Sequence, residues 1–217
     1  MPVVEYGAMS LEDAYGLAVE RHRAGKFGEA VQILRQILSA EPNHRLAAAM
    51  LGSVFCMEGR FAEAAEVLQP LIDAEPANFT AQMNLGGAYL GVEDGDKAIA
   101  CFEDACRLRP DDPSSVAGLG NAHLISGKPS DAERCYRKAI SLDPSEYEYH
   151  VVLAALLDSL DRQEEARDIY RQAIELEPTD GTLRVRMAVS LFELNELDLA
   201  RQECMTALGL LGSCATT

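Results

Sequence analysis

Five prolines recur along this chain at a fixed interval of 34 residues, each just after a stretch of helix-forming residues. Proline lacks a backbone N–H and therefore ends an α-helix that runs into it. A chain that stops a helix at regular intervals is built from a repeated structural unit, so the period predicts stacked helical repeats rather than one globular core. The five residues are Pro42, Pro76, Pro110, Pro144 and Pro178.

Placing Pro42 at position 32 of a repeat divides most of the chain into six repeats without insertion or deletion. Position 20 is alanine in all six repeats, position 8 is always glycine or alanine, and position 24 is bulky in five repeats but Cys204 in the sixth. The predicted divisions are an N-terminal extension (1–10), repeats at 11–44, 45–78, 79–112, 113–146, 147–180 and 181–214, of which the last is degenerate, and a tail (215–217).

Positions 4, 7, 8 and 11 of a repeat lie on one face of a helix, and so do positions 20, 24, 27 and 28. Each repeat is therefore predicted to be two amphipathic helices, joined by a turn with a glycine near the end of the first helix. We expect the small residue at position 8 to face the alanine at position 20, so that the two backbones approach closely. One such hairpin cannot bury its apolar face alone, so consecutive hairpins stack and share a core.

This pattern resembles the tetratricopeptide repeat (TPR) family, which has small residues at positions 8 and 20, a large residue at position 24 and proline at position 32. The resemblance covers residues 11–214, although Gly212 stands where the last repeat should have its proline. It implies an all-α fold, a right-handed superhelical α-solenoid of TPR helix hairpins. TPR arrays serve many unrelated partners, so the resemblance fixes architecture better than function.

In TPR arrays the first helix of each hairpin lines a concave groove, mainly through positions 2, 5, 6, 9 and 12. Here positions 5, 9 and 12 are mostly small or apolar, which suits an extended peptide or an amphipathic helix of a partner protein. The alternative is that neighbouring helices or the N-terminus cover some of these side chains. The predicted protein-binding groove consists of Tyr15, Val19, Ala49, Ser53, Met83, Asn84, Gly87, Leu90, Ala117, Asn121, Leu124, Val151, Ala155, Val185, Val189 and Phe192.

Two binding modes known in the TPR family can be compared with these positions. The clamp for a C-terminal carboxylate needs lysine at position 5, which never occurs here, so this clamp is absent. A ladder of asparagines at position 6 would hold a peptide backbone, but only Asn84 fits, with Asn121 nearby at position 9. These two asparagines are predicted to bond the main chain of a bound peptide, with an isolated solvated asparagine as the alternative.

The net charge of −16 argues against nucleic acid and anionic membranes as primary partners. Repeat five is the most acidic, which fits either a basic partner segment or a merely solubilising surface. No apolar stretch is long enough for a membrane span, and the first ten residues show no signal peptide, so no direct membrane insertion is expected.

Catalysis finds little support in the sequence. His123 and His150 occupy core positions of their repeats, and no nucleophile or phosphate-binding motif is recognisable. The six cysteines show no metal-site spacing and are interpreted as small apolar residues in a buried, reducing setting, which predicts a cytoplasmic protein. We therefore expect no enzyme activity, no catalytic residues, no metal and no cofactors.

The last helix ends in an apolar segment with Leu208, Leu210 and Leu211 and lacks a polar capping helix. A partner could cover that end, two copies could meet there, or the chain could be part of a longer protein. The favoured function is a non-enzymatic scaffold that binds a partner protein in its groove. The alternatives are a self-assembling, homo-oligomeric TPR scaffold and the recognition arm of a larger enzyme such as a glycosyltransferase, because similar arrays precede such domains in some bacterial proteins.

Overall fold

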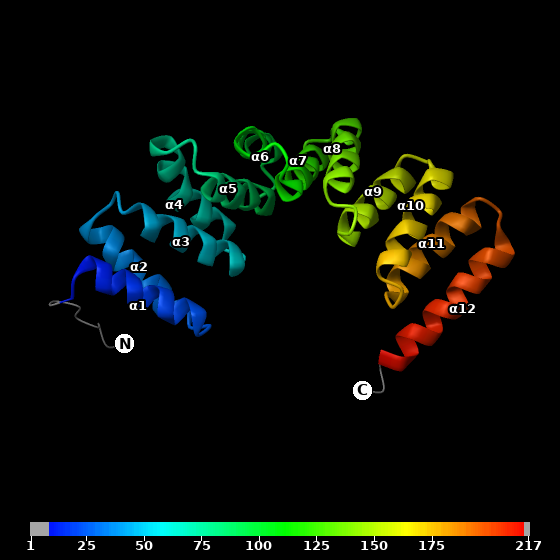
Figure 1. Ribbon diagram of the computed structural model, residues 1–217, viewed down its shortest axis with the longest axis horizontal. Helices are drawn as coiled ribbons and strands as arrows, with labels where there is room; N and C mark the ends of the chain where they lie inside the picture. Colours follow the sequence, from blue (N-terminus) through cyan, green and yellow to red (C-terminus); the bar gives the residue numbers. More distant parts are fainter. Residues whose placement is uncertain (1–8, 215–217) are drawn as a thin grey trace. The chain divides into compact units, whose positions relative to one another are not determined.

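The structure is a computed structural model that describes residues 9–214. Within this range it contains twelve α-helices and no strand, which confirms the predicted all-α class (Figure 1). The helices are α1 (Leu11–Arg23), α2 (Phe27–Ala40), α3 (Arg45–Met57), α4 (Phe61–Ala74), α5 (Phe79–Gly91), α6 (Gly95–Leu108), α7 (Pro113–Ile125), α8 (Pro129–Leu142), α9 (Tyr147–Ser159), α10 (Gln163–Leu176), α11 (Gly181–Glu193) and α12 (Leu197–Cys214).

The chain divides between Pro110 and Asp111 into two compact halves. The N-terminal half contains α1–α6 and the C-terminal half α7–α12, so each half holds three helix hairpins. Within each half, the second helix of one hairpin packs on the first helix of the next, as α4 does on α5 and α10 on α11. Each half is therefore a stack of hairpins, as the repeat predicts.

The second helices end as the proline period predicts. For example, α2 ends at Ala40 and α10 at Leu176, each two residues before its proline. The next first helix then begins with a side-chain cap in several repeats, because Asn78 accepts a hydrogen bond from the Ala81 amide and Asp112 from the Ser115 amide.

The turn inside each hairpin has the same backbone path in all six repeats. Position 15 is left-handed throughout, with glycine at that position in three repeats. The other three repeats place a side chain there, on Glu93 (φ 59°), Asp161 (φ 57°) and Asn195 (φ 61°). The following residue donates its N–H to the carbonyl five residues earlier, as Arg60 does to Phe55 at 2.8 Å. Hydrogen bonds thus determine the conformation of the turn. Glycine only lowers the free-energy cost of its left-handed residue.

The packing inside the hairpins shows what fills the space beside position 8. In the three repeats with glycine there, the atoms nearest to the missing side chain belong to the bulky residue at position 24. A Cβ on Gly86 would lie 2.9 Å from the Phe102 ring, and one on Gly120 would lie 3.0 Å from the Tyr136 ring. The physical reason is size, since the ring at position 24 needs the space that a missing side chain leaves.

The histidine and cysteine expectations are met in part. His150 is buried as predicted, whereas His123 is half-buried. Cys101 is buried, and burial raises the pKa of its thiol to about 11, while Cys56 is only half-buried. For Cys204 the buried interpretation is wrong, because this thiol is exposed.

Candidate functional site

The predicted groove residues of the N-terminal half lie on the first helices α1, α3 and α5, and all are partly exposed. Helix α3 contacts α5 directly, and the Cys56 thiol donates to the Asn84 carbonyl oxygen at 3.5 Å across that contact. Most of the surface is small or apolar, with Ser53 and Asn84 as its polar members. We call the predicted groove residues of one half its inner face. In the N-terminal half these are Tyr15, Val19, Ala49, Ser53, Met83, Asn84, Gly87 and Leu90.

The apolar residues on the inner face of the C-terminal half become more exposed from α7 to α11. Ala117 on α7 is buried, while Val151 and Ala155 on α9 are half-buried. On α11 the three predicted residues are open, with Val185 exposed by 42%, Val189 by 54% and Phe192 by 67%. These three side chains are spaced i, i+4 and i+7, so they form one apolar stripe along α11. Asn121 is exposed and Leu124 is half-buried.

Asn121 is held by a buried tyrosine. The Tyr136 hydroxyl donates to the Asn121 side-chain oxygen at 2.6 Å, although the Tyr136 side chain is itself only 1% exposed. Burial raises the pKa of this phenol, so it stays protonated and remains a donor. With its oxygen used in this way, Asn121 can offer its amide nitrogen to the carbonyl group of a ligand.

A second polar cluster joins α9, α10 and α11 in the C-terminal half. Ser190 donates its hydroxyl to Asp158 at 2.7 Å, and the charge of the same carboxylate acts on the buried Tyr170 hydroxyl. Burial and then the charge of Asp158 raise the pKa of Tyr170 to about 12, while a hydrogen bond from Arg186 acts in the opposite direction. The carboxylate of Asp158 has lone pairs for further donors, so the cluster can anchor a ligand's N–H or hydroxyl group.

Sequence reasoning missed Asp158 and Arg186, which lie on first helices beside the inner face. Asp158 lies at position 12 and Arg186 at position 6, both groove positions, but neither was selected because the predicted groove was apolar. The signal that could have found Asp158 is the tyrosine at position 24, which occurs only in repeats four and five. In each of these repeats the phenol reaches a polar residue of the first helix, which is Asn121 or Asp158.

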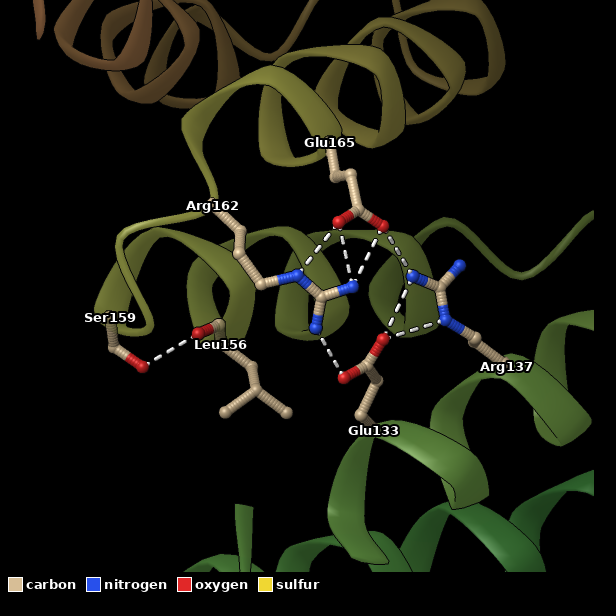
Figure 2. A network of polar contacts seen from close by, with 6 residues as sticks. All are labelled: Glu133, Arg137, Leu156, Ser159, Arg162 and Glu165. Carbon is tan, nitrogen blue, oxygen red and sulfur yellow. Dashed lines mark hydrogen bonds and ion pairs between the residues drawn. The ribbon is translucent and has the colours of Figure 1, made fainter. Parts of the chain in front are cut away.

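Two acidic residues of repeat five, Glu165 and Asp168, are paired with arginine. Figure 2 shows Arg162 between Glu133 (2.6 Å) and Glu165 (2.7 Å), with Arg137 bonded to the same two carboxylates. The hydrogen bonds from Arg162 are the main cause that lowers the pKa of Glu133 and Glu165. In the same view the Ser159 hydroxyl donates to the Leu156 carbonyl oxygen at 2.6 Å, in the last turn of α9.

The same pairing occurs in the N-terminal half, where Arg60 and Arg35 share Glu63 at the equivalent repeat positions. This recurrence indicates a device that joins adjacent hairpins rather than a site for a basic ligand. Glu63, Glu133 and Glu165 therefore already have cationic partners and are less available to a basic ligand.

Two further properties of residues 9–214 limit what else the surface offers. No group of three or more histidine, cysteine or acidic side chains in this range is arranged to hold a metal ion. No helix of the described chain is long and apolar enough to cross a membrane.

A known protein family matches this chain over most of its length. A family model described as the cilia and flagella-associated protein 70 C-terminal domain matches residues 3–216. No curated protein sequence matches the chain.

Solved structures with the same fold include MamA, 19% identical with a TM-score of 0.72 over 77% of this chain and 98% of that chain. MamA from Desulfovibrio magneticus RS-1, residues 41 to the end, is 22% identical with a TM-score of 0.74, covering 77% of this chain and 95% of that one. TTC0263, a thermophilic TPR protein of Thermus thermophilus, is 24% identical with a TM-score of 0.63, covering 84% and 100%. At these identities the likeness concerns the fold alone.

Proposed function

This chain belongs to the family of the cilia and flagella-associated protein 70 C-terminal domain, a tetratricopeptide repeat family, and we propose that it is a non-enzymatic scaffold that binds a segment of a partner protein. The inner faces of the first helices are the proposed binding surface. A bound segment buries apolar side chains there and aligns its main chain with the polar anchors.

The single observation that carries the proposal is the open apolar stripe on α11. A chain with a net charge of −16 has ample polar surface, yet Val189 and Phe192 are more than half exposed on adjacent turns of one helix. Exposed apolar side chains that gather on one face mark interaction sites more often than isolated ones do. Full burial of one such side chain contributes about 1.5 to 3 kcal/mol, which is enough to make this stripe the main source of affinity.

The polar anchors define what the bound segment offers. Asn121 presents an amide nitrogen to a carbonyl oxygen, and Asp158 presents a carboxylate to an N–H group. An extended peptide carries both groups on every residue, so it satisfies both anchors at once. This favours a peptide whose main chain is accessible, with apolar side chains directed to α11.

The proposal is tested by quantitative pull-down from a lysate of the source organism. Wild type is compared with Val189→Glu/Phe192→Glu and with the inner-face variant Met83→Glu/Leu90→Glu/Val151→Glu. Leu176→Glu is the matched control, because Leu176 is 39% exposed at the end of α10 and outside the predicted groove. A protein captured by wild type and the control but lost by the inner-face variants supports the proposal. Equal capture by all four proteins contradicts it.

We also propose that the protein is located in the cytoplasm. Cys56, Cys101 and Cys204 stand outside any disulfide in the described chain. Several reduced thiols in one chain suit a reducing compartment. A role as the recognition arm of a larger enzyme stays a prediction from the resemblance.

A further inference from the structure

A cavity of about 460 Å³ lies in the N-terminal half, where α2, α3 and α4 meet. This volume falls within the range of about 300 to 1,000 Å³ that is typical of small-molecule sites. The two least exposed residues of its wall are Leu71 at 5% and Ala48 at 9%. None of its residues belongs to the inner face. The apolar part of the wall consists of Leu38, Ala48, Val67, Pro70, Leu71 and Ala74.

The cavity occupies a space that a longer side chain fills one repeat later. Ala48 lies at position 4 of repeat two, where repeat three has Gln82, a side chain that is only 1% exposed. The Gln82 amide nitrogen donates to the Pro76 carbonyl oxygen at 3.2 Å and to the Asp104 carboxylate at 3.2 Å. In repeat two the residue equivalent to Asp104 is Pro70. Both members of this polar pair are thus replaced by side chains without a polar atom, and the space between the helices stays open.

The backbone follows the same path beside both sites, so the two repeats can be compared closely. Glu41 and Glu75, which precede the two prolines, have φ of −134° and −135°. Pro42 therefore corresponds to Pro76 in conformation as well as in sequence, and it lines the cavity. Ala48 has no side-chain N–H, so it cannot give the Pro42 carbonyl oxygen the hydrogen bond that Pro76 receives.

The last repeat shows that this hydrogen bond is not peculiar to repeat three. Arg184, again at position 4, donates to the Pro178 carbonyl oxygen at 3.4 Å. Two different side chains thus reach the proline carbonyl group from the same position of their repeats. In repeat two this donor has to come from solvent or from a ligand in the cavity.

A second acceptor adjoins the cavity on α4. Proline has no N–H, so Pro70 leaves the Glu66 carbonyl oxygen without its helical donor, and both residues line the cavity. The charges around the cavity argue against an anionic ligand. Arg45, which also lines it, is paired with Glu75, whereas the side chain of Glu66 is exposed and negative. The matching ligand is therefore uncharged, mostly apolar and equipped with a hydrogen-bond donor.

We propose that this cavity binds an indole ring, which lies against the apolar wall and donates its ring N–H to the Pro42 carbonyl oxygen. An indole combines a rigid apolar body with one donor, and a buried indole N–H usually has an acceptor. The same ring occurs in free indole-type molecules and in the tryptophan side chain of a protein. The proposal uses no residue of the inner face, so it goes beyond the proposed function and can fail independently of it.

Titration of the full chain with indole, followed by the methyl signals in NMR spectra, tests the proposal. The signals of Ala48 and Leu71 are expected to shift to saturation with a dissociation constant of about 1 mM or below. The signal of Leu46, which is 60% exposed on α3 and outside the cavity, is expected to stay in place. 1-Methylindole keeps the ring but lacks the N–H, so it should bind about tenfold more weakly.

The source of the ring is distinguished by a parallel titration with N-acetyltryptophanamide, which carries the tryptophan side chain on a short main chain. Tighter binding of this compound than of indole supports the proposal with a tryptophan of another protein as the occupant. Tighter binding of indole supports it with a free molecule as the occupant.

Filling the cavity provides the decisive variant. Ala48→Gln introduces the side chain that repeat three carries at this position, so it should fill the cavity, donate to Pro42 and weaken indole binding at least tenfold. Ala62→Gln, an exposed residue of α4 outside the cavity, is the matched control and should bind indole as wild type does. Circular dichroism checks that both variants keep their helices. No saturable shift at Ala48 and Leu71, equal affinity for indole and 1-methylindole, or undiminished binding by Ala48→Gln would overturn the proposal.

Discussion

The two halves of the molecule use the same core position for different ends. In the N-terminal half, position 24 is filled by Leu34, Leu68 or Phe102, whose side chains only pack. In repeats four and five, Tyr136 and Tyr170 fill it equally well, being 1% exposed, but each carries a hydroxyl that interacts with a polar residue of a first helix, Asn121 or Asp158. The tyrosine hydroxyl thus connects a core position that the repeats share to a surface position of the first helix that varies between repeats.

The comparison explains how a repeat protein can vary its surface without disturbing its fold. The ring at position 24 needs the empty space of position 8 in both halves, as Gly86 and Gly120 show. The hydroxyl extends past that space to the first helix, where it meets Asn121 in one repeat. Packing and recognition are therefore separable at the level of a single side chain.

The largest expected effect tests whether position 24 carries equal weight in both halves. Phe102→Ala and Tyr136→Ala are each expected to lower the free energy of unfolding by about 3 to 5 kcal/mol, because both leave a large cavity beside a glycine. Urea denaturation followed by circular dichroism measures this, with Ile125→Ala, 42% exposed, as the control. A cost below about 1 kcal/mol for either variant would show that the halves differ in core packing.

The second effect concerns a proline within α4. Pro70 lies inside this helix, where it removes a backbone donor, whereas the equivalent residue of α8 is Lys138. Pro70→Ala is expected to raise the free energy of unfolding by about 1 to 3 kcal/mol, and Lys138→Pro to lower it by about 3 kcal/mol. Thermal melting of both variants provides the check. A destabilising Pro70→Ala would mean that the proline ring contributes more to packing than its missing N–H costs.

Alkaline pH should destabilise the chain through the buried Tyr170. The pKa of Tyr170 is raised from 10.0 to about 12 in the folded chain, mainly by burial. A raised folded pKa means that the stabilisation is complete below pH 10 and is lost as the pH rises through about 12. Unfolding free energies measured across this window should fall for wild type and fall less for Tyr170→Phe. Identical pH dependence of the two proteins would contradict the assignment.

A graft of the tyrosine–asparagine pair sharpens the comparison further. Gly87 occupies the position of Asn121, and a Cβ there would meet no atom within 4 Å. In a double-mutant cycle, Gly87→Asn and Phe102→Tyr are expected to couple favourably by about 1 kcal/mol, the usual net value of one hydrogen bond. Gly87→Ala with Phe102→Tyr is the control, and it should show no coupling.

A comparably small effect is expected in the hairpin turns. Glu93 adopts the left-handed conformation that Gly59 adopts one repeat earlier. Glu93→Gly is expected to stabilise the chain by up to about 1 kcal/mol, and Gly59→Ala to destabilise it by about 1 to 2 kcal/mol. Denaturation midpoints compare them. Destabilisation by Glu93→Gly would indicate that its side chain contributes more than its backbone strain costs.

The fold could be predicted well from the sequence because each structural signal occurs in several repeats. The proline at position 32 located the end of α2 and of α10. The hairpin turns were harder to predict, because their left-handed residue is glycine at residue 59 but not at Glu93 or Asp161.

Prediction of the site was limited by contacts between repeats. The inner face was assigned from position alone, and this could not reveal that Ser190 of one repeat donates to Asp158 of another. Nor could position show that Cys204 lies exposed while Cys101 is buried, because that difference depends on which helix packs next. Local pattern specifies an element, whereas exposure depends on its neighbours in space.

The central claim, that a partner binds along the inner face, is tested most directly by site-specific photo-crosslinking in cells of the source organism. The photoreactive amino acid p-benzoylphenylalanine replaces Phe192 in one variant and Leu176 in a second, since both side chains are exposed but only Phe192 belongs to the inner face. Covalent adducts with one other protein at Phe192, and none at Leu176, are the predicted result. No adduct at Phe192, or the same adducts at both positions, would contradict the account.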